Sequence, residues 1–268
     1  MKKIKHQQAS ARIFWHERVM RMKIYCAGTT AAAEYAATEL WEAGWNVTTQ
    51  PGSDVQVLLL DVPSFGANGF LRGGDEIQKF LEQLPRDVVI CGGRLEHSAL
   101  NGYAKIDLLQ DEDYLAENAY ITAEAALDVA LPYLRRTVRG CKVLILGWGR
   151  IGKCLANLLK GMGADVTVAA RKPADRAMLR ALGFEAVEFP VSDEIVQSVE
   201  LIYNTVPYEV VDSSRAGNCI KIDLASRQGI TGDDVVIARG LPGIHFPESS
   251  GKLIAKTLTR ILRKEEFS

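Results

Sequence analysis

The segment 142–169 constrains the fold of this 268-residue chain more than any other. An apolar run of strand-forming residues, 142–146, ends directly before Gly147, and residues 151–162 have the pattern of a helix. Gly163 and a second strand-like run, 165–169, follow. Strand, glycine turn, helix and strand make a complete βαβ unit, in which the two strands are parallel. The turn has the spacing G-x-G-x-x-G, and in this setting it predicts a binding site for a dinucleotide.

Each glycine of this turn has a physical task. Gly147 makes the tight turn, Gly149 lets the backbone approach a pyrophosphate, and Gly152 lets the helix pack closely on the strand. The amides and the positive dipole end of the helix then hold the phosphates. The candidate cofactor-binding segment consists of Gly147, Trp148, Gly149, Arg150, Ile151 and Gly152. A turn that is only structural is the alternative.

The end of the second strand indicates which dinucleotide fits. An acidic residue there would hydrogen-bond the ribose hydroxyls of NAD and repel a 2′-phosphate. This chain has Ala169, Ala170, Arg171 and Lys172 instead. The two cations attract a phosphate, and Arg171 can do so through a bidentate contact. We therefore predict that NADP(H) is preferred and that NAD(H) stays possible; a solvated basic turn is the alternative.

From residue 22 onward, short β-rich runs alternate with longer helical ones, as in βα units with a parallel sheet. Two such series are visible, so the expected fold class is α/β, with two Rossmann-like, doubly wound parallel-sheet domains. The expected order is a disordered basic extension at 1–21, an α/β substrate-side domain at 22–117, a bridging helix at 118–139, an NAD(P)-binding Rossmann domain at 140–247, and a C-terminal helix at 248–268 that packs back on the first domain.

Composition excludes several classes of protein. The hydrophobic fraction of 47% and the net charge of -1 argue against disorder and against a broad polyanion-binding surface, so we expect no nucleic-acid partner. The five cysteines are odd in number and form no C-x-x-C pair, which favours reduced thiols in a cytoplasmic protein. No apolar run reaches the roughly 18 residues of a membrane span, so no membrane association is expected.

Three later segments, taken together with the Gly147 turn, resemble the A subunit of dipicolinate synthase. They read Leu-Ile-Tyr-Asn-Thr-Val-Pro at 201–207, Ile-Asp-Leu-Ala-Ser-Arg at 222–227, and Gly-Leu-Pro-Gly-Ile at 240–244, with Pro247 beyond. The stretch 118–124 also resembles the segment that leads into that family's nucleotide domain. The resemblance is specific from about residue 118 to the C-terminus, and before that only the order of elements agrees.

The resemblance implies a dehydrogenase-like protein that works with a flavin-binding partner, the B subunit, during sporulation of endospore-forming bacteria. Together they would form pyridine-2,6-dicarboxylate from a dihydrodipicolinate-type intermediate by removing two hydrogens. It also implies which residues border the nicotinamide: Asn204, Thr205, Val206 and Pro207, with Asp223 and Ala225 nearby. Loops after parallel strands are also where the second half of a dinucleotide lies. We further expect a small dicarboxylate as substrate and a homo-oligomer.

Four further residues are candidates for catalysis, although the four scattered histidines assemble no serine–histidine–acid arrangement and no metal site. His245 lies in a glycine- and proline-rich loop and is a candidate acid/base or substrate-binding group; loop packing is the alternative. Arg227 suits a substrate carboxylate, with a surface ion pair as the alternative. Thr122 and Glu124 on the bridging helix face either the cleft between the domains or its surface.

A D-2-hydroxyacid dehydrogenase, whose two domains are arranged in the same way, is the main competing interpretation. Such enzymes hold the substrate carboxylate with an arginine and use a late histidine as acid and base. Arg227 follows the matching strand, but its turn is one residue longer, and the histidine expected after Pro242 is Gly243. Because no clear proton donor is in place, a non-catalytic, nucleotide-binding regulatory subunit is the third interpretation.

Overall fold

The structure is a computed structural model that describes residues 22–66 and 68–264. The chain divides into two compact units. Unit 1 comprises residues 1–117 and 246–268, and unit 2 comprises residues 118–245. The predicted extension at 1–21 and the last four residues of the predicted C-terminal helix lie outside the described residues.

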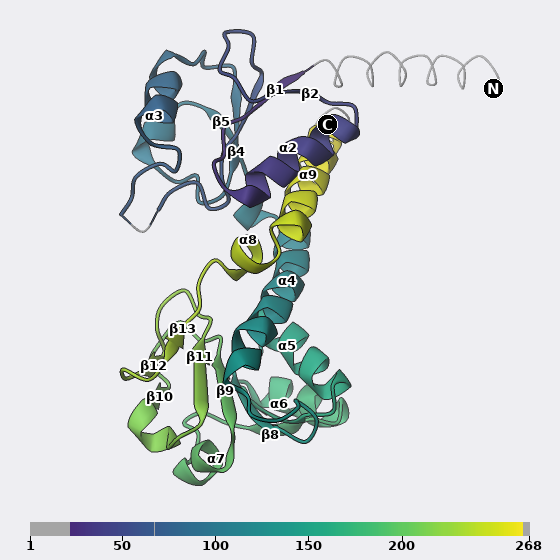
Figure 1. The fold of residues 1–268 in the computed structure, drawn as a ribbon, viewed down its shortest axis with the longest axis vertical. Coiled ribbons are helices and arrows are strands. Elements are labelled where there is room, and N and C mark those ends of the chain that lie inside the picture. Colours follow the sequence, from purple (N-terminus) through teal and green to yellow (C-terminus); the bar gives the residue numbers. More distant parts are fainter. Residues whose placement is uncertain (1–21, 67, 265–268) are drawn as a thin grey trace, which may run out of the picture. The chain divides into compact units, whose positions relative to one another are not determined.

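Unit 1 contains a five-stranded sheet in which every pair of neighbours is parallel (Figure 1). Its strands are β1 (Lys23–Cys26), β2 (Asn46–Thr48), β3 (Val57–Leu59), β4 (Val89–Gly92) and β5 (Ala104–Asp107), in the order β2-β1-β3-β4-β5. The helical elements between them are α2 (Ala31–Glu42), α3 (Gly74–Gln83), η1 (Ser98–Leu100) and η2 (Leu108–Gln110). The apolar residues of β3 are all buried, because helices cover both faces of such a sheet.

The C-terminal helix α9 (Pro247–Lys264) packs along α2 within unit 1 (Figure 1). Small residues allow this close approach, since a Cβ on Gly251 would stand 2.4 Å from the Cβ of Tyr35. Polar contacts hold the far end of the helix: the indole of Trp45 donates to Thr259 at 3.0 Å, and Arg260 forms an ion pair with Asp111 at 2.6 Å.

The long helix α4 spans Glu112–Ala130, where a bridging helix was expected at 118–139. It begins within unit 1 and ends where the short 3₁₀ helix η3 (Leu131–Tyr133) takes over. The cause is Pro132, which has no amide for an α-helical hydrogen bond and whose ring clashes with the preceding turn.

Unit 2 contains a six-stranded, fully parallel sheet in the order β13-β11-β9-β6-β7-β8. The strands are β6 (Lys142–Leu146), β7 (Asp165–Ala169), β8 (Glu185–Val187), β9 (Leu201–Asn204), β11 (Ile220–Asp223) and β13 (Val236–Ile237). The helices are α5 (Arg150–Gly161), α6 (Pro173–Ala181), α7 (Asp193–Ser198), η4 (Ser213–Ala216) and α8 (Leu241–His245), and β10 (Val211–Asp212) pairs separately with β12 (Ile230–Thr231). The chain order of this sheet reverses between β6 and β9, as in dinucleotide-binding folds.

The prediction of an α/β fold with two Rossmann-like parallel sheets is confirmed. The expected strands at 142–146 and 165–169 match β6 and β7 at both ends. In the described part of the chain, no helix is long and apolar enough to cross a membrane.

Candidate functional site

The carboxyl ends of the central strands of unit 2 lie side by side. Leu146, the last residue of β6, pairs with Ala169 of β7 on one side and with Asn204 of β9 on the other. Asn204 pairs in turn with Asp223, the last residue of β11. The loops that follow these strands therefore start from one edge of the sheet, at the point where ligands bind in open α/β folds.

A pocket of about 220 Å³ opens at this edge. Such a volume is smaller than the roughly 300–1,000 Å³ of a pocket that holds a whole drug-sized ligand. It therefore suits one part of a dinucleotide rather than all of it. Its lining consists of Gly147, Trp148, Gly149, Ala170, Arg171, Lys172, Asp175, Phe189, Thr205, Val206, Pro207 and Tyr208.

The three glycines of the turn differ in the space around them. Gly147 has a φ of +109°, a conformation that residues with a side chain rarely adopt. A Cβ on Gly152 would stand 2.3 Å from the carbonyl oxygen of Gly147, so α5 approaches the turn as closely as a glycine allows. A Cβ on Gly149 would meet no atom within 4 Å. The open side of Gly149 faces a pocket that a phosphate group can enter.

The start of α5 supplies the donors for such a phosphate. The N-cap residue of this helix is Gly149, which has no side chain to accept hydrogen bonds from the amides of the first turn. These amides and the helix dipole favour an anion. The residues present at the site thus fit the pyrophosphate of a nicotinamide dinucleotide.

Trp148 lies half-buried at the edge of the pocket. Its ring packs edge-on against Phe184, with ring centroids 6.0 Å apart, and the Lys153 ammonium lies 5.9 Å from its centroid. The indole is therefore held in place next to the pocket, where its fluorescence can report on a bound ligand.

The turn between β7 and α6 carries the predicted cations. Arg171 and Lys172 line the pocket and are exposed, whereas Ala170 is buried. Arg176 fixes the backbone of this turn, because its guanidinium donates to the carbonyl oxygens of Ala170 at 2.9 Å and of Arg171 at 2.8 Å. The same guanidinium pairs with Glu188 at 3.0 Å.

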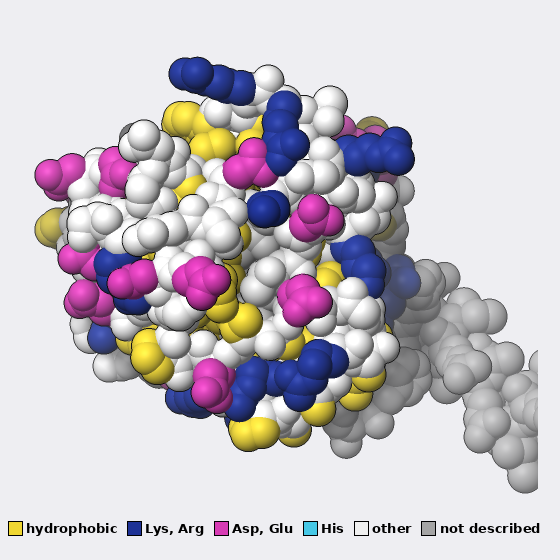
Figure 2. Space-filling model, turned by 90° about the horizontal axis from the view of Figure 1, so that it is seen from below, with side chains coloured by type: hydrophobic (Ala, Val, Ile, Leu, Met, Phe, Trp, Pro, Cys, Tyr) yellow, Lys and Arg dark blue, Asp and Glu magenta, His cyan; other side chains and the backbone are white. Residues whose placement is uncertain are grey.

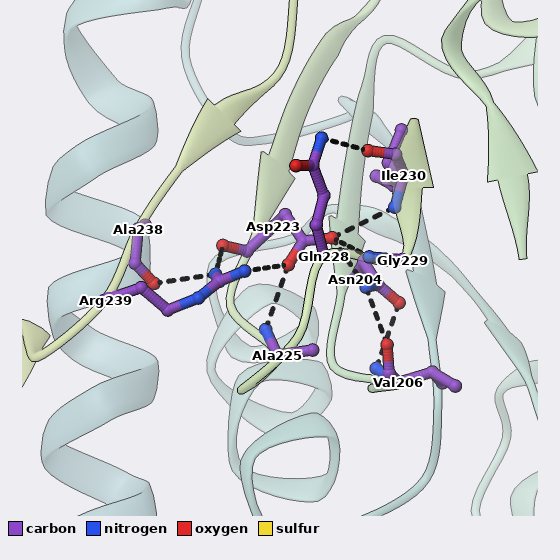
Figure 3. A network of polar contacts seen from close by, with 9 residues as sticks. All are labelled: Asn204, Val206, Asp223, Ala225, Gln228, Gly229, Ile230, Ala238 and Arg239. Carbon is purple, nitrogen blue, oxygen red and sulfur yellow. Dashed lines mark hydrogen bonds and ion pairs between the residues drawn. The ribbon is translucent and has the colours of Figure 1, made fainter. Parts of the chain in front are cut away.

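Asn204 and Asp223, predicted to contact the cofactor, do not line the pocket and are fully buried. The amide nitrogen of Asn204 donates to the carboxylate of Asp223 at 2.8 Å and to the carbonyl oxygen of Val206 at 3.0 Å (Figure 3). The amide oxygen of Asn204 accepts from the Val206 amide at 3.0 Å. These contacts fix the loop after β9 and leave the Asn204 side chain no free group for a ligand.

The Asp223 carboxylate accepts five hydrogen bonds within the protein (Figure 3). The donors are the backbone amides of Ala225, Gly229 and Ile230, the side-chain amide of Asn204, and the guanidinium of Arg239. Five donors saturate both oxygens, and Arg239 balances the charge. These hydrogen bonds position the loops around Asp223, and a direct contact of its carboxylate with the cofactor stays a prediction.

The other predicted cofactor residues divide into two groups. Thr205, Val206 and Pro207 line the pocket, and the hydroxyl of Thr205 donates to the carbonyl oxygen of Leu146 at 2.9 Å, which ties the loop to β6. The residues that do not line the pocket are Arg150, Ile151, Gly152 and Ala225. Gly152 acts through close packing, as expected.

Two of the four candidate catalytic residues, Arg227 and His245, follow the strand β11 in unit 2. Arg227 is exposed on the bend after β11, and its guanidinium has no hydrogen bond or ion pair to another described residue. His245 ends α8, a short helix where a loop was expected. Its Nδ1 lies 2.6 Å from a carboxylate oxygen of Asp128 on α4. Because a carboxylate only accepts, this contact orients the imidazole and leaves Nε2 available.

The other two candidates, Thr122 and Glu124, do not share a face of α4. Thr122 is buried, and its hydroxyl donates to the carbonyl oxygen of Asn118 at 2.7 Å. Glu124 is exposed. Side chains two residues apart on an α-helix point about 200° away from each other around the helix axis. Thr122 and Glu124 therefore cannot serve one site together.

Three residues of the pocket lining were not predicted from the sequence: Asp175, Phe189 and Tyr208. Phe189 and Tyr208 follow β8 and β9, so a search of every loop at the carboxyl edge would have found them. Asp175 lies in the first turn of α6. The sequence could have indicated it, because the helix that follows a strand begins at the same edge of the sheet as the pocket.

Thiol and metal chemistry are not indicated in the described part of the chain. Burial raises the pKa of the Cys26 thiol to about 12, and it also raises the pKa of Cys91, so both stay protonated. The same described residues contain no group of three histidine, cysteine, aspartate or glutamate side chains that could hold a metal ion.

Comparisons with known proteins agree with this geometry. Residues 110–211 match the family described as D-isomer specific 2-hydroxyacid dehydrogenase, NAD binding domain. Unit 2 thus contains a nicotinamide-dinucleotide-binding domain of dehydrogenase type. The A subunit of dipicolinate synthase from Bacillus subtilis (strain 168) is 28% identical over 240 residues, which cover 81% of each chain.

Two solved structures have the same fold as this chain. The structure of the dipicolinate synthase A subunit from Bacillus halodurans superposes with a TM-score of 0.77 at 22% identity, covering 91% of this chain and 98% of that one. The A chain of dipicolinate synthase from Bacillus subtilis gives a TM-score of 0.73 at 22% identity, covering 91% and 96%. The chain is therefore similar in sequence to the A subunit of dipicolinate synthase over four fifths of its length, and it has the fold of that protein.

Proposed function

We propose that this protein is the NADP(H)-binding A subunit of a dipicolinate synthase. In this role it forms pyridine-2,6-dicarboxylate from a dihydrodipicolinate-type intermediate during sporulation, in the cytoplasm and together with a flavoprotein subunit. The observation that carries the proposal is the similarity to the A subunit over both units, combined with the preformed pocket at Gly149.

The nicotinamide supplies hydride transfer when it is bound. The start of α5 would hold the pyrophosphate, and Arg171 and Lys172 would contact the adenosine ribose and its 2′-phosphate. Arg171 and Lys172 attract a 2′-phosphate, and Ala170 brings no negative charge that would repel it. Both features support the preference for NADP(H). Arg227, exposed at the carboxyl edge, is the proposed partner of a substrate carboxylate.

Calorimetric titration with NADPH and NADH tests the cofactor assignment. We expect NADPH to bind more tightly, and tighter binding of NADH would contradict the proposed preference. Gly149→Trp should weaken binding about 100-fold or more, because its side chain fills the pocket where a phosphate would lie. Gly161→Trp is the matched control, since a Cβ on Gly161 at the other end of α5 also meets no atom within 4 Å.

Reconstitution tests the proposed reaction and partner. The purified protein, mixed with the flavoprotein subunit, should form the pyridine dicarboxylate, and Gly149→Trp should abolish product formation while Gly161→Trp does not. Size-exclusion chromatography of the chain alone and of the mixture tests the proposed homo-oligomer and the proposed complex. Product formation undiminished by Gly149→Trp would instead support a regulatory or scaffold role for the nucleotide.

A D-2-hydroxyacid dehydrogenase is the second candidate. The match of residues 110–211 to that family's NAD-binding domain favours it, as does the contact of His245 with Asp128, which resembles an oriented acid/base group. Oxidation of NADPH or NADH in the presence of pyruvate or hydroxypyruvate tests it. Robust turnover without a partner subunit would place this candidate first.

A further inference from the structure

The pocket contains a charge that opposes its two cations. Among the described residues that line it, Asp175 is the one carboxylate, and it shares this lining with Arg171 and Lys172. Asp175 is half-buried, and its carboxylate forms no hydrogen bond or ion pair with another described residue. A half-buried carboxylate without a protein partner is available to a ligand in the pocket.

The turn that carries these charges is held firmly. Arg176, the next residue after Asp175, binds the carbonyl oxygens of Ala170 and Arg171 and pairs with Glu188. Asp175 itself lies in the first turn of α6, beside the turn that Arg176 holds. The backbone that carries Asp175 is thus held in place at the pocket, and its carboxylate lines the pocket.

At the adenosine ribose, a carboxylate has opposite effects on the two cofactors. It accepts hydrogen bonds from the free 2′- and 3′-hydroxyls of NADH, and it repels the 2′-phosphate of NADPH. The side chain of Ala170, at the position where such an acid usually stands, can do neither. We propose that Asp175 takes over this function. Its carboxylate then limits the preference for NADP(H) that the attraction of Arg171 and Lys172 for a 2′-phosphate produces.

This proposal rests on the proposed function, because it requires a dinucleotide in this pocket. Only charged side chains close to the ribose are expected to affect which cofactor binds there. On the face shown in Figure 2, Lys and Arg side chains occur in several small groups with Asp and Glu side chains nearby. Screening at physiological salt also limits charge effects to about 8 Å, so residues of the pocket dominate.

The test is the variant Asp175→Asn, titrated calorimetrically with NADPH and NADH. Asp165→Asn is the matched control: it makes the same change of charge at an exposed residue at the amino end of β7, on the opposite edge of the sheet. We expect Asp175→Asn to tighten NADPH binding about 5- to 20-fold and to weaken NADH binding. The control should leave the ratio of the two dissociation constants unchanged, and Asp175→Glu should keep the wild-type direction of preference.

Two further measurements locate the effect. The gain in NADPH affinity should shrink as salt is raised, and 2′-AMP should gain affinity for Asp175→Asn while 5′-AMP should not. A ratio that changes less than about twofold in Asp175→Asn, with both cofactors still binding, would overturn the proposal and leave the dinucleotide assignment intact. Failure of both cofactors to bind the wild-type protein would overturn the assignment itself, and the proposal with it.

Discussion

The guanidinium of Arg239 donates to the carboxylate of Asp223 across 2.8 Å, and the side chain of Asp223 is fully buried while that of Arg239 is 33% exposed. Arg239 also donates to the backbone carbonyl oxygens of Asp223 and Ala238. The pair therefore joins the segment after β13 to the end of β11. It holds the carboxyl edge of the sheet together at the side where the second half of a dinucleotide would lie.

Removal of either partner should destabilise unit 2, to different degrees. Asp223→Ala removes the acceptor of five hydrogen bonds and leaves Arg239 without its carboxylate, so a loss of about 3–5 kcal/mol in the free energy of unfolding is expected. Arg239→Met leaves Asp223 four of its five donors, so its loss should be smaller, about 1.5–3 kcal/mol. Urea unfolding of both variants measures the difference, and equal losses would show that the other four hydrogen bonds do not stabilise the carboxylate.

Arg176 is expected to act as a positioning residue for the turn that carries Arg171. Arg176→Leu removes both hydrogen bonds to the turn, so the turn should lose its fixed shape and NADPH binding should weaken about 3- to 10-fold. Arg180→Leu, an exposed arginine one turn further along α6, is the control and should not change NADPH affinity. A merely structural role would lower the melting temperature of Arg176→Leu without changing the ratio of NADPH to NADH affinity.

The buried Lys221 should make the stability of unit 2 depend on acid pH through Asp234. Its ammonium donates to Asp234 at 2.6 Å and to the carbonyl oxygens of Gly217 and Cys219, while its side chain is 1% exposed. The hydrogen bond from Lys221, and a second from Ser213, lower the pKa of Asp234. A lowered folded-state pKa means that this contribution is present above the unfolded pKa of about 3.9 and is lost as pH falls through the folded pKa.

Lys221→Met should therefore have two measurable effects. At pH 7 it leaves two backbone carbonyl groups without their donor and should cost about 1–3 kcal/mol. Below about pH 4, its stability should fall less steeply with pH than that of the wild type. Lys142→Met, at an exposed lysine of β6, is the control, and an unchanged acid slope in Lys221→Met would contradict the role of the Lys221–Asp234 pair.

Local patterns in the sequence predicted the central part of this fold well. Gly147 follows the apolar run of β6, and Gly163 and Arg171 flank that of β7, so the ends of both strands could be predicted from adjacent residues alone. The apolar spacing of α4 continues beyond Ala130 to Leu134, whereas the α-helix itself ends before Pro132 and a 3₁₀ turn follows.

The roles of individual site residues depended on contacts that the sequence does not display. Asn204 and Asp223 follow neighbouring strands and were expected to face the cofactor, but their side chains turn toward each other across 2.8 Å. Asp223 and Arg239, which form an ion pair, are 16 positions apart in the sequence, and no local pattern predicts their contact. Asp175 was overlooked because the acidic residue was expected at the end of the strand rather than in the helix that follows it.

The contact between His245 and Asp128 leads to a prediction about proton transfer in the proposed reaction. If His245 Nε2 exchanges a proton with the substrate, His245→Gln should lower turnover of the reconstituted enzyme about 10²- to 10⁴-fold and leave the dissociation constant for NADPH unchanged. Asp128→Asn keeps the imidazole but replaces the carboxylate that orients it by an amide, so turnover should fall by a smaller factor. Initial rates of the two reconstituted variants, measured with NADPH saturating, determine both factors. Turnover within about twofold of wild type in His245→Gln, together with a lower melting temperature, would instead make the contact a structural link between α8 and α4.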